Sequence, residues 1–199
     1  MTLDLLLAFA TYAFVSSITP GPNNTLLLMS GVNFGFRATI PHILGVNLGF
    51  SAMVLIVGLG IGGLFVAFPI LHDVLRYGGA LYLLYLGWRI AFSDLVTTKG
   101  ARGKPLNFVQ AAAFQWVNPK AWIMAIGAVA TYTPLDNFIS NILIVTMMFS
   151  IINGPCIIAW AEFGTLLRGF LGTPVWLRAF NISMALLLVA SLYPTLGLR

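Results

Sequence analysis

The chain has 199 residues, of which 59% are hydrophobic and 8% are charged, and its mean hydropathy is +0.96. Soluble domains carry roughly a quarter charged residues, so this composition excludes a water-soluble globular protein and indicates a membrane protein. The net charge of +5 is not concentrated in a dense basic patch, which argues against a nucleic-acid partner. The length predicts one transmembrane domain over residues 1–199.

The amino-terminal segment contains Asp4 and no Lys or Arg, so it lacks the basic region that opens a signal peptide. We therefore expect the first membrane span to start at Leu3. The single cysteine, Cys156, cannot form an intramolecular disulfide and does not indicate a compartment.

Six apolar segments are long enough to cross a bilayer, which takes about 20 residues per helix. In chain order they cover residues 3–29, 40–68, 71–92, 108–131, 137–167 and 177–197. The first contains a polar interruption at 19–23 and the fourth one at 118–120. The only sizeable connection, 93–107, separates a first half, 1–92, from a second half, 108–199. The sequence therefore predicts an all-α membrane protein in which helices one and four are broken.

Basic residues are distributed unequally between the two sides of this predicted bundle. One side holds Arg37, Arg89, Lys99, Arg102, Lys104, Arg168 and Arg178, whereas the other holds only Arg76 and Arg199. Cytoplasmic loops carry the excess of Lys and Arg. This bias predicts that connection 93–107 is cytoplasmic and that both termini lie outside the cytoplasm, in the periplasm of a bacterial cell.

Three spans in each half imply that the halves enter the membrane from opposite sides. If they share a fold, they form an inverted repeat. Faint internal similarity supports such a repeat: both interruptions combine Pro with Asn, and Gly45-Val46-Asn47 in the second span resembles Asn153-Gly154-Pro155 in the fifth. The glycines of the second span, spaced at Gly45 and Gly49 and again further along, predict close helix packing.

The first interruption is Thr19-Pro20-Gly21-Pro22-Asn23. Its two prolines remove amide donors, so carbonyls near Ser16 and Ile18 lose their helical partners. A helix that restarts near Asn23 presents free amides and a positive dipole end, which can hold a carboxylate. Asn23 and Asn24 could cap this restart or bind substrate; the alternative is a kink that serves only packing.

The second interruption is Asn118-Pro119-Lys120. Counted from Phe108, Lys120 lies on the order of 18 Å into the bilayer, where an ammonium costs at least about 2.5–3.5 kcal/mol. It must face a cavity or a partner. We expect it to receive a substrate carboxylate or to be linked to a coupling proton; a structural ion pair is the alternative. Gln115 precedes the interruption and could line the same cavity.

Glu162 is the one carboxylate well inside a span, and it is the candidate for proton coupling. It could instead pair with Lys120, meet a substrate ammonium, or pair with Arg168 near the membrane surface. Asn47 and Asn153 are further candidates for substrate binding, although interhelical hydrogen bonding is the commoner role of buried Asn in membranes.

Some chemistry finds no support in the sequence. It contains no glycine-rich phosphate loop, so no ATP site is expected. His42 and His72 are far apart, and Cys156 lacks a second soft ligand, so no metal site or other cofactor is expected. No nucleophile lies in a pattern with a base, so we do not expect an enzyme.

At these residues the chain resembles the lysine-exporter (LysE-type) family of amino-acid efflux proteins, and it is most similar to the branch of homoserine, threonine and cysteine exporters. The resemblance runs almost end to end. It rests on the motif 19–23, Gly35-Phe36-Arg37 with Gly45, the segments 79–83 and 86–87, and 114–120. It implies a six-helix exporter in the bacterial inner membrane, driven by the proton motive force, for amino acids or related metabolites.

We therefore expect a proton-coupled secondary transporter that exports amino acids by alternating access, with two inverted three-helix repeats. The expected substrate-binding residues are Pro20, Gly21, Pro22, Asn23, Asn47, Asn118, Pro119, Lys120 and Asn153. The alternatives are a transporter of a small cation or metal ion, which the shortage of acidic and soft ligands disfavours, and a membrane assembly protein without transport activity. The particular substrate and the oligomeric state are not fixed by the sequence; a homodimer is one option.

Overall fold

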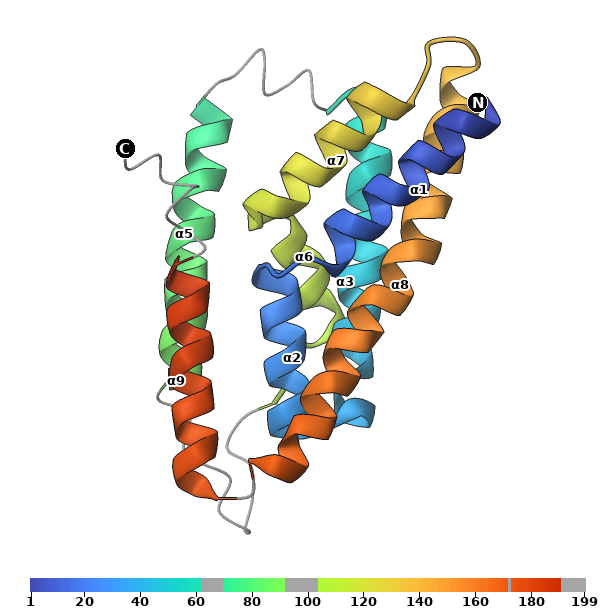
Figure 1. Cartoon of the computed structure of the whole chain (residues 1–199). Helices are drawn as coiled ribbons and strands as arrows, with labels where there is room; N and C mark the ends of the chain where they lie inside the picture. Colours follow the sequence, from blue (N-terminus) through green and yellow to red (C-terminus); the bar gives the residue numbers. More distant parts are fainter. Residues whose placement is uncertain (62–69, 92–103, 172, 191–199) are drawn as a thin grey trace.

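The computed structural model describes residues 1–61, 70–91, 104–171 and 173–190. Over these residues it is a helical bundle without strands (Figure 1). The first half contains α1 (Leu3–Ile18), α2 (Pro22–Phe34), α3 (Phe36–Ile56) with a short π-helical extension η1 (Val57–Ile61), and α5 (Ile70–Ala91). The second half contains α6 (Phe108–Val117), α7 (Pro119–Tyr132), α8 (Phe138–Phe170) and α9 (Pro174–Ala190).

Both expected interruptions are confirmed, and local backbone rules explain them. A residue that precedes proline is pushed out of the helical region. Thr19 before Pro20 (φ −65°, ψ 145°) and Asn118 before Pro119 (φ −90°, ψ 109°) are both extended. Pro22 and Pro119 then occupy the first positions of α2 and α7, where a missing amide costs nothing. The axes of α1 and α2 differ by 52°.

The connection between α2 and α3 is a single residue, Gly35, with φ 80° and ψ 168°. This left-handed conformation favours glycine, and it lets α3 begin at Phe36, four residues before the start that we expected from hydropathy. The sixth expected span begins three residues earlier than predicted, at Pro174, and its expected end lies outside the described residues, as does the end of the second span.

The prediction of six membrane spans is supported only in part. Among the described residues, Phe36–Gly60 and Phe138–Phe170 are long and apolar enough to cross a membrane, and α1 with α2 qualifies as one bent span. The other three expected spans do not meet this criterion over the residues described. Apolar side chains cover much of the outer surface, as a bilayer requires; Leu81, Ile123 and Ile151 are among those exposed.

Close helix contacts depend on small residues. The Cβ of an alanine at Gly45 would lie 2.4 Å from the carbonyl oxygen of Phe108, and one at Gly49 would lie 2.5 Å from the Cα of Ala112. The expected packing role of these glycines is therefore confirmed at the contact between α3 and α6. An aromatic cluster fills the neighbouring core, in which the ring of Phe149 contacts those of Phe9 and Phe50.

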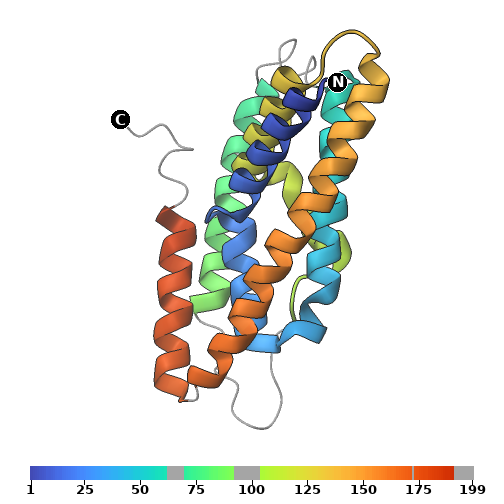
Figure 2. The same cartoon turned by 45° about the vertical axis from the view of Figure 1, so that its right-hand side comes forward.

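The arrangement of the helices places both breaks between the two ends of the bundle, away from either end (Figure 1). Two views show α1, α2, α3, α6, α7 and α8 packed together, while α5 and α9 lie side by side at one edge (Figures 1 and 2). The α2–α3 connection and the carboxyl end of α8 lie at the end of the bundle opposite the amino terminus (Figure 1).

Candidate functional site

The two breaks meet, although about a hundred residues separate them in the sequence. The ammonium of Lys120 donates hydrogen bonds to the carbonyl oxygen of Thr19 (2.7 Å), to its hydroxyl (2.9 Å) and to the carbonyl oxygen of Pro20 (3.3 Å). A second link joins Asn23 to Gln115, whose side-chain amides exchange hydrogen bonds of 2.8 and 3.1 Å. The interruption of the first half is thus held by residues of the second half.

Gly21 allows this approach. Its backbone is extended (φ 177°, ψ 177°), a conformation open to any residue, so conformational freedom does not explain the glycine. The lack of space explains the glycine, because a Cβ at this position would lie 2.7 Å from the Cδ of Lys120 and 3.2 Å from its Nζ. The stem of Lys120 therefore packs directly on the backbone of Gly21.

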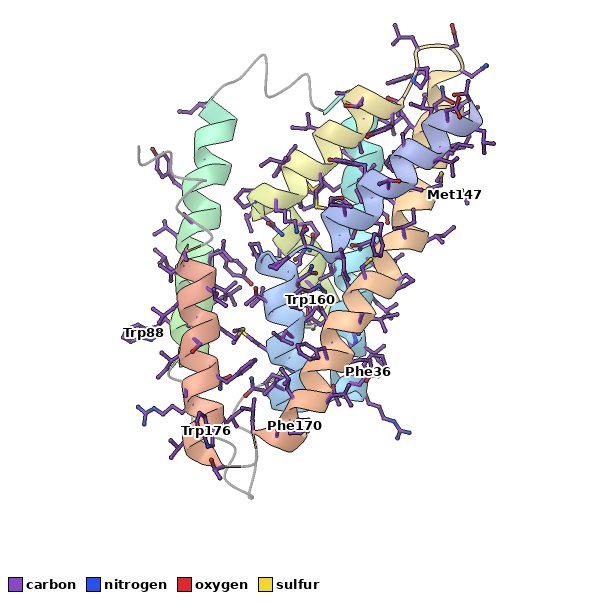
Figure 3. All side chains as sticks on the ribbon, viewed as in Figure 1. Phe36, Trp88, Met147, Trp160, Phe170 and Trp176 are labelled. Carbon is purple, nitrogen blue, oxygen red and sulfur yellow. The ribbon has the colours of Figure 1, made fainter. Side chains whose placement is uncertain are left out.

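Side chains from three helices satisfy the carbonyl groups that the prolines leave without partners. The hydroxyl of Thr19 donates to the carbonyl of Ser16 (3.1 Å). The indole of Trp160 on α8 donates to the carbonyl of Ile18 (3.0 Å), and Figure 3 shows Trp160 beside the α1–α2 break. The amide of Asn24 donates to the carbonyls of Ser17 and Thr19, both at 2.8 Å. The freed carbonyls expected near Ser16 and Ile18 are confirmed, but Asn24 does not cap α2.

The amino end of α2 is left open. Its N-cap residue is Gly21, which has no side chain to accept a hydrogen bond. No side chain at the cap therefore accepts from the amides of the first turn. The amino end of α7 differs, since the side chain of Asn118 accepts a hydrogen bond from the amide of Lys120 (3.1 Å). The first turn of α7 therefore has one amide capped by a side chain, whereas the first turn of α2 has none.

A small cavity, partly open to the outside, lies between the two breaks. Polar and apolar residues share its wall. The polar ones are Ser16, Ser17, Asn23, Asn24, Asn118, Lys120 and Asn153, and the others are Gly21, Val46, Phe50, Ala121, Met124 and Ile157. Lys120 is the only ionisable residue among them.

Ser17 carries the unpaired buried polar atom of the cavity wall among the described residues. Its side chain is 3% exposed, it lines the cavity, and its hydroxyl has no hydrogen-bond partner among the described residues. An unpaired buried hydroxyl costs about 1–3 kcal/mol. A molecule bound in the cavity could relieve this cost.

Five of the expected substrate-binding residues line the cavity, namely Gly21, Asn23, Asn118, Lys120 and Asn153. Pro20, Pro22 and Pro119 are not on its wall; they shape the breaks. Asn47 does not line the cavity. It accepts a hydrogen bond from the lining residue Asn153 (2.9 Å) and donates one to the hydroxyl of Ser150 (3.1 Å). Asn47 and Asn153, which the internal similarity pairs, are therefore bonded to each other.

Glu162 lies apart from these residues. It is half-buried on α8 and does not line the cavity. Two of the expected alternatives are wrong, because the ammonium of Lys120 is bonded to Thr19 and Pro20 instead of a carboxylate, and no ion pair joins Glu162 to Arg168 among the residues described. A role in proton coupling stays a prediction.

The sequence alone does not predict that Trp160, the apolar wall of the cavity, and the side chains of Ser16 and Ser17 belong to the site. No local signal marks these residues, since serines and tryptophans at helical spacing are common in membrane helices. Only the position of the breaks, one turn after Ser16 and Ser17, could have drawn attention to them.

We expect a Trp160→Phe exchange to lower the stability by about 1 kcal/mol, because it leaves the partly buried carbonyl of Ile18 without this donor. Thermal unfolding in detergent measures this change. Trp176→Phe is the matched control, since Trp176 is 64% exposed and should unfold like the parent protein. Equal unfolding temperatures for the two variants would show that the indole contributes nothing at the break.

Paired helix breaks that enclose a polar cavity define a class of membrane transporter rather than an enzyme. Comparison with known proteins narrows the class: residues 14–191 match the family model of the LysE type translocator, and the chain belongs to this family. It is 35% identical over 191 residues to the cysteine/O-acetylserine efflux proteins of Escherichia coli (strain K12) and Shigella sonnei (strain Ss046), with 95% of this chain and 96% of each relative covered. No solved structure matches it.

Proposed function

We propose that the protein exports small, uncharged amino acids across the bacterial inner membrane and that the cavity between the breaks is its substrate site. The contact that carries this proposal is the one between Lys120 and the Thr19–Pro20 backbone. It joins the two interrupted helices at a cavity whose other polar residues are uncharged. Transporters place their substrates where broken helices meet.

The substrate carboxylate binds at the open amino end of α2. The free amides of this end and its positive dipole favour an anion. The unpaired hydroxyl of Ser17 and the side-chain amide of Asn118, whose Nδ2 group has no partner among the described residues, supply further donors at the same cavity. Asn23 and Asn153 complete the polar wall, with Asn47 holding Asn153 in place.

The walls favour a short, uncharged substrate side chain. Val46, Phe50, Met124 and Ile157 form the apolar part of the cavity. No carboxylate lines it among the residues that the structure describes, so the side-chain cation of a basic amino acid would have no acidic partner there. Lys120 already supplies the charge that an α-carboxylate needs. The cysteine/O-acetylserine efflux relatives agree with such a substrate. The lack of acidic lining also disfavours transport of a metal ion or small cation.

Alternating access follows if the halves are inverted repeats that rock against each other. The repeat pairs α1, α2 and α3 with α6, α7 and α8. Exchange of the two halves turns the contact between α3 and α6 into a contact between α8 and α1, and both contacts are present. The equivalent residues Asn47 and Asn153 are also bonded to each other. Movement between the halves would break the links from Lys120 and from Gln115.

The orientation that we propose puts connection 93–107 in the cytoplasm and both termini in the periplasm. One end of the bundle holds the start of α3 with Arg37, the last turn of α8 with Arg168 and the start of α9 with Arg178 (Figure 1). The opposite end holds Asp4 at the start of α1 and Asp136 in the α7–α8 connection (Figure 1). An excess of basic residues marks the cytoplasmic side. Residues 1–199 act as one transport domain in this proposal.

Flux into proteoliposomes tests the proposed function. Vesicles loaded with O-acetylserine should exchange it for external labelled O-acetylserine or cysteine, and should exchange lysine poorly. Empty vesicles and vesicles offered a divalent metal are the controls. Metal flux without amino-acid exchange would favour the cation transporter, and no flux at all would favour a membrane assembly protein.

Proton coupling is proposed to pass through Glu162, the half-buried carboxylate of α8. We expect Glu162→Gln to keep substrate exchange, which needs no net proton movement, and to lose the substrate accumulation driven by an imposed pH gradient. Asp136→Asn is the control, because Asp136 is exposed in the α7–α8 connection. If Glu162→Gln still accumulates substrate in response to the gradient, another group carries the proton.

A further inference from the structure

The ammonium of Lys120 is held only by neutral oxygens. A lysine ammonium has three donors, and the three hydrogen bonds to Thr19 and Pro20 use all of them. No carboxylate contacts it among the residues that the structure describes. The oxygens belong to the carboxyl end of α1, where the helix dipole is negative. Nothing in this set of acceptors is specific for a lysine side chain; any primary ammonium fits them.

These oxygens are also reachable. Thr19 and Pro20 are exposed, and the hydrogen bonds from Lys120 lie at the surface of the chain. Irregular backbone at membrane depth is tolerated only against protein or a water-filled space, so the break borders a path for water and solutes. Lys120 lines the cavity and packs its stem against Gly21, while its ammonium is bonded to the exposed oxygens of Thr19 and Pro20.

We propose that the carbonyl oxygens of Thr19 and Pro20, together with the Thr19 hydroxyl, form the ammonium site for the transported amino acid. In the structure Lys120 occupies this site in place of the substrate. When a substrate ammonium takes over the three oxygens, the ammonium of Lys120 is released to pair with the substrate carboxylate. This inference rests on the proposed function and deepens it, because it assigns separate partners to the two charged ends of the substrate.

The exchange explains why the cation is not paired with a carboxylate. An ion pair with Glu162 would be hard to break inside the membrane, whereas hydrogen bonds to carbonyl groups are replaced one for one by the incoming ammonium. The substrate thereby releases one of the links between the two halves, the one from Lys120 to Thr19 and Pro20. Its amino group and its carboxylate must both be present for this to happen.

Chemical rescue tests the ammonium site without any transport. Lys120→Ala removes the atoms from Cγ to Nζ, a gap that n-propylammonium matches. We expect n-propylammonium chloride to raise the unfolding temperature of Lys120→Ala by about 2–4 °C at saturation. N,N,N-trimethylpropylammonium, which has the same charge but no N–H donor, should give no shift. Equal shifts for both cations would overturn the proposal.

Two further proteins serve as controls in this experiment. The parent protein should not respond, because its own lysine fills the site. Lys120→Met should not respond either, because the methionine side chain fills the same space without a charge. A response of Lys120→Met equal to that of Lys120→Ala would show binding elsewhere and would overturn the assignment.

A second experiment, with Lys120 intact, links the site to the substrate. We compare inhibition of O-acetylserine exchange by unlabelled O-acetylserine and by its analogue with a hydroxyl in place of the amino group. Thr19→Val removes one oxygen of the site and should reduce the preference for the amino compound about 10-fold. Thr11→Val, an exposed threonine on the same helix, should keep the full preference.

The outcomes separate the two proposals. If the parent protein exchanges no amino acid, the proposed function fails whatever the rescue shows. If it exchanges amino acids and Thr19→Val keeps the full preference, the ammonium site is refuted while the proposed function stands. Rescue of Lys120→Ala together with a reduced preference in Thr19→Val supports the site.

Discussion

Replacing Lys120 with methionine should reduce amino-acid exchange about 10- to 100-fold, which corresponds to the loss of one charged hydrogen-bonding partner. The expected loss is large because Lys120 is the only ionisable residue on the part of the cavity wall that the structure describes. Methionine keeps most of the stem that packs on Gly21, so the bundle should still assemble. Proteoliposome exchange with labelled O-acetylserine gives the rate, and gel filtration in detergent reports the fold.

Lys104→Met is the matched control, since Lys104 is exposed in the segment before α6 and should leave exchange unchanged. Lys120→Arg keeps the charge but should also lose activity, because the Cδ of Lys120 already lies within 2.7 Å of the Cβ position at Gly21 and a guanidinium needs more room. Normal exchange by Lys120→Met would remove this residue from the substrate site.

A Gly164→Ala exchange should destabilise the protein most strongly among small substitutions. The added Cβ would lie 2.0 Å from the carbonyl oxygen of Leu28 on α2, which is backbone and cannot turn aside. Overpacking of this kind costs about 1–3 kcal/mol or more, so we expect the unfolding temperature to fall by at least about 2–4 °C. The contact is reciprocal, since a Cβ at Gly31 would meet the carbonyl oxygen of Ala161.

Gly169→Ala on the same helix is the control, because no atom lies within 4 Å of the Cβ position there. It should unfold at or above the temperature of the parent protein. Gly31→Ala should resemble Gly164→Ala, and the double variant should cost less than the sum, because both changes open one contact. Similar stability of Gly164→Ala and Gly169→Ala would mean that α2 and α8 do not pack as closely as described.

The breaks were predictable because their causes are local. Proline acts on its own amide and on the residue before it, so Pro20, Pro22 and Pro119 fix where α1 and α6 end, whatever surrounds them. The need of Lys120 for a polar partner was also predictable, since an ammonium in the bilayer is costly. The identity of this partner was not predictable from the sequence.

The missed features depend on contacts between distant segments. The sequence left open whether Lys120 receives a substrate carboxylate or pairs with a carboxylate such as Glu162. In the structure it is bonded to the carbonyl groups of Thr19 and Pro20. Trp160 reaches the first break because α8 packs beside it. Gln115, expected on the cavity wall, is instead fully buried and bonded to Asn23. Periodicity within one helix does not contain such information.

Accessibility of residue 17 tests most directly the claim that both breaks enclose a substrate cavity. In a protein with Cys156→Ala, a Ser17→Cys variant in proteoliposomes should react with a hydrophilic methanethiosulfonate, and O-acetylserine should slow the reaction. Phe14→Cys, on the same helix but 53% exposed on the apolar surface, should stay unreactive in the bilayer. A thiol at position 17 that never reacts, or that reacts at the same rate with O-acetylserine present, would contradict the account.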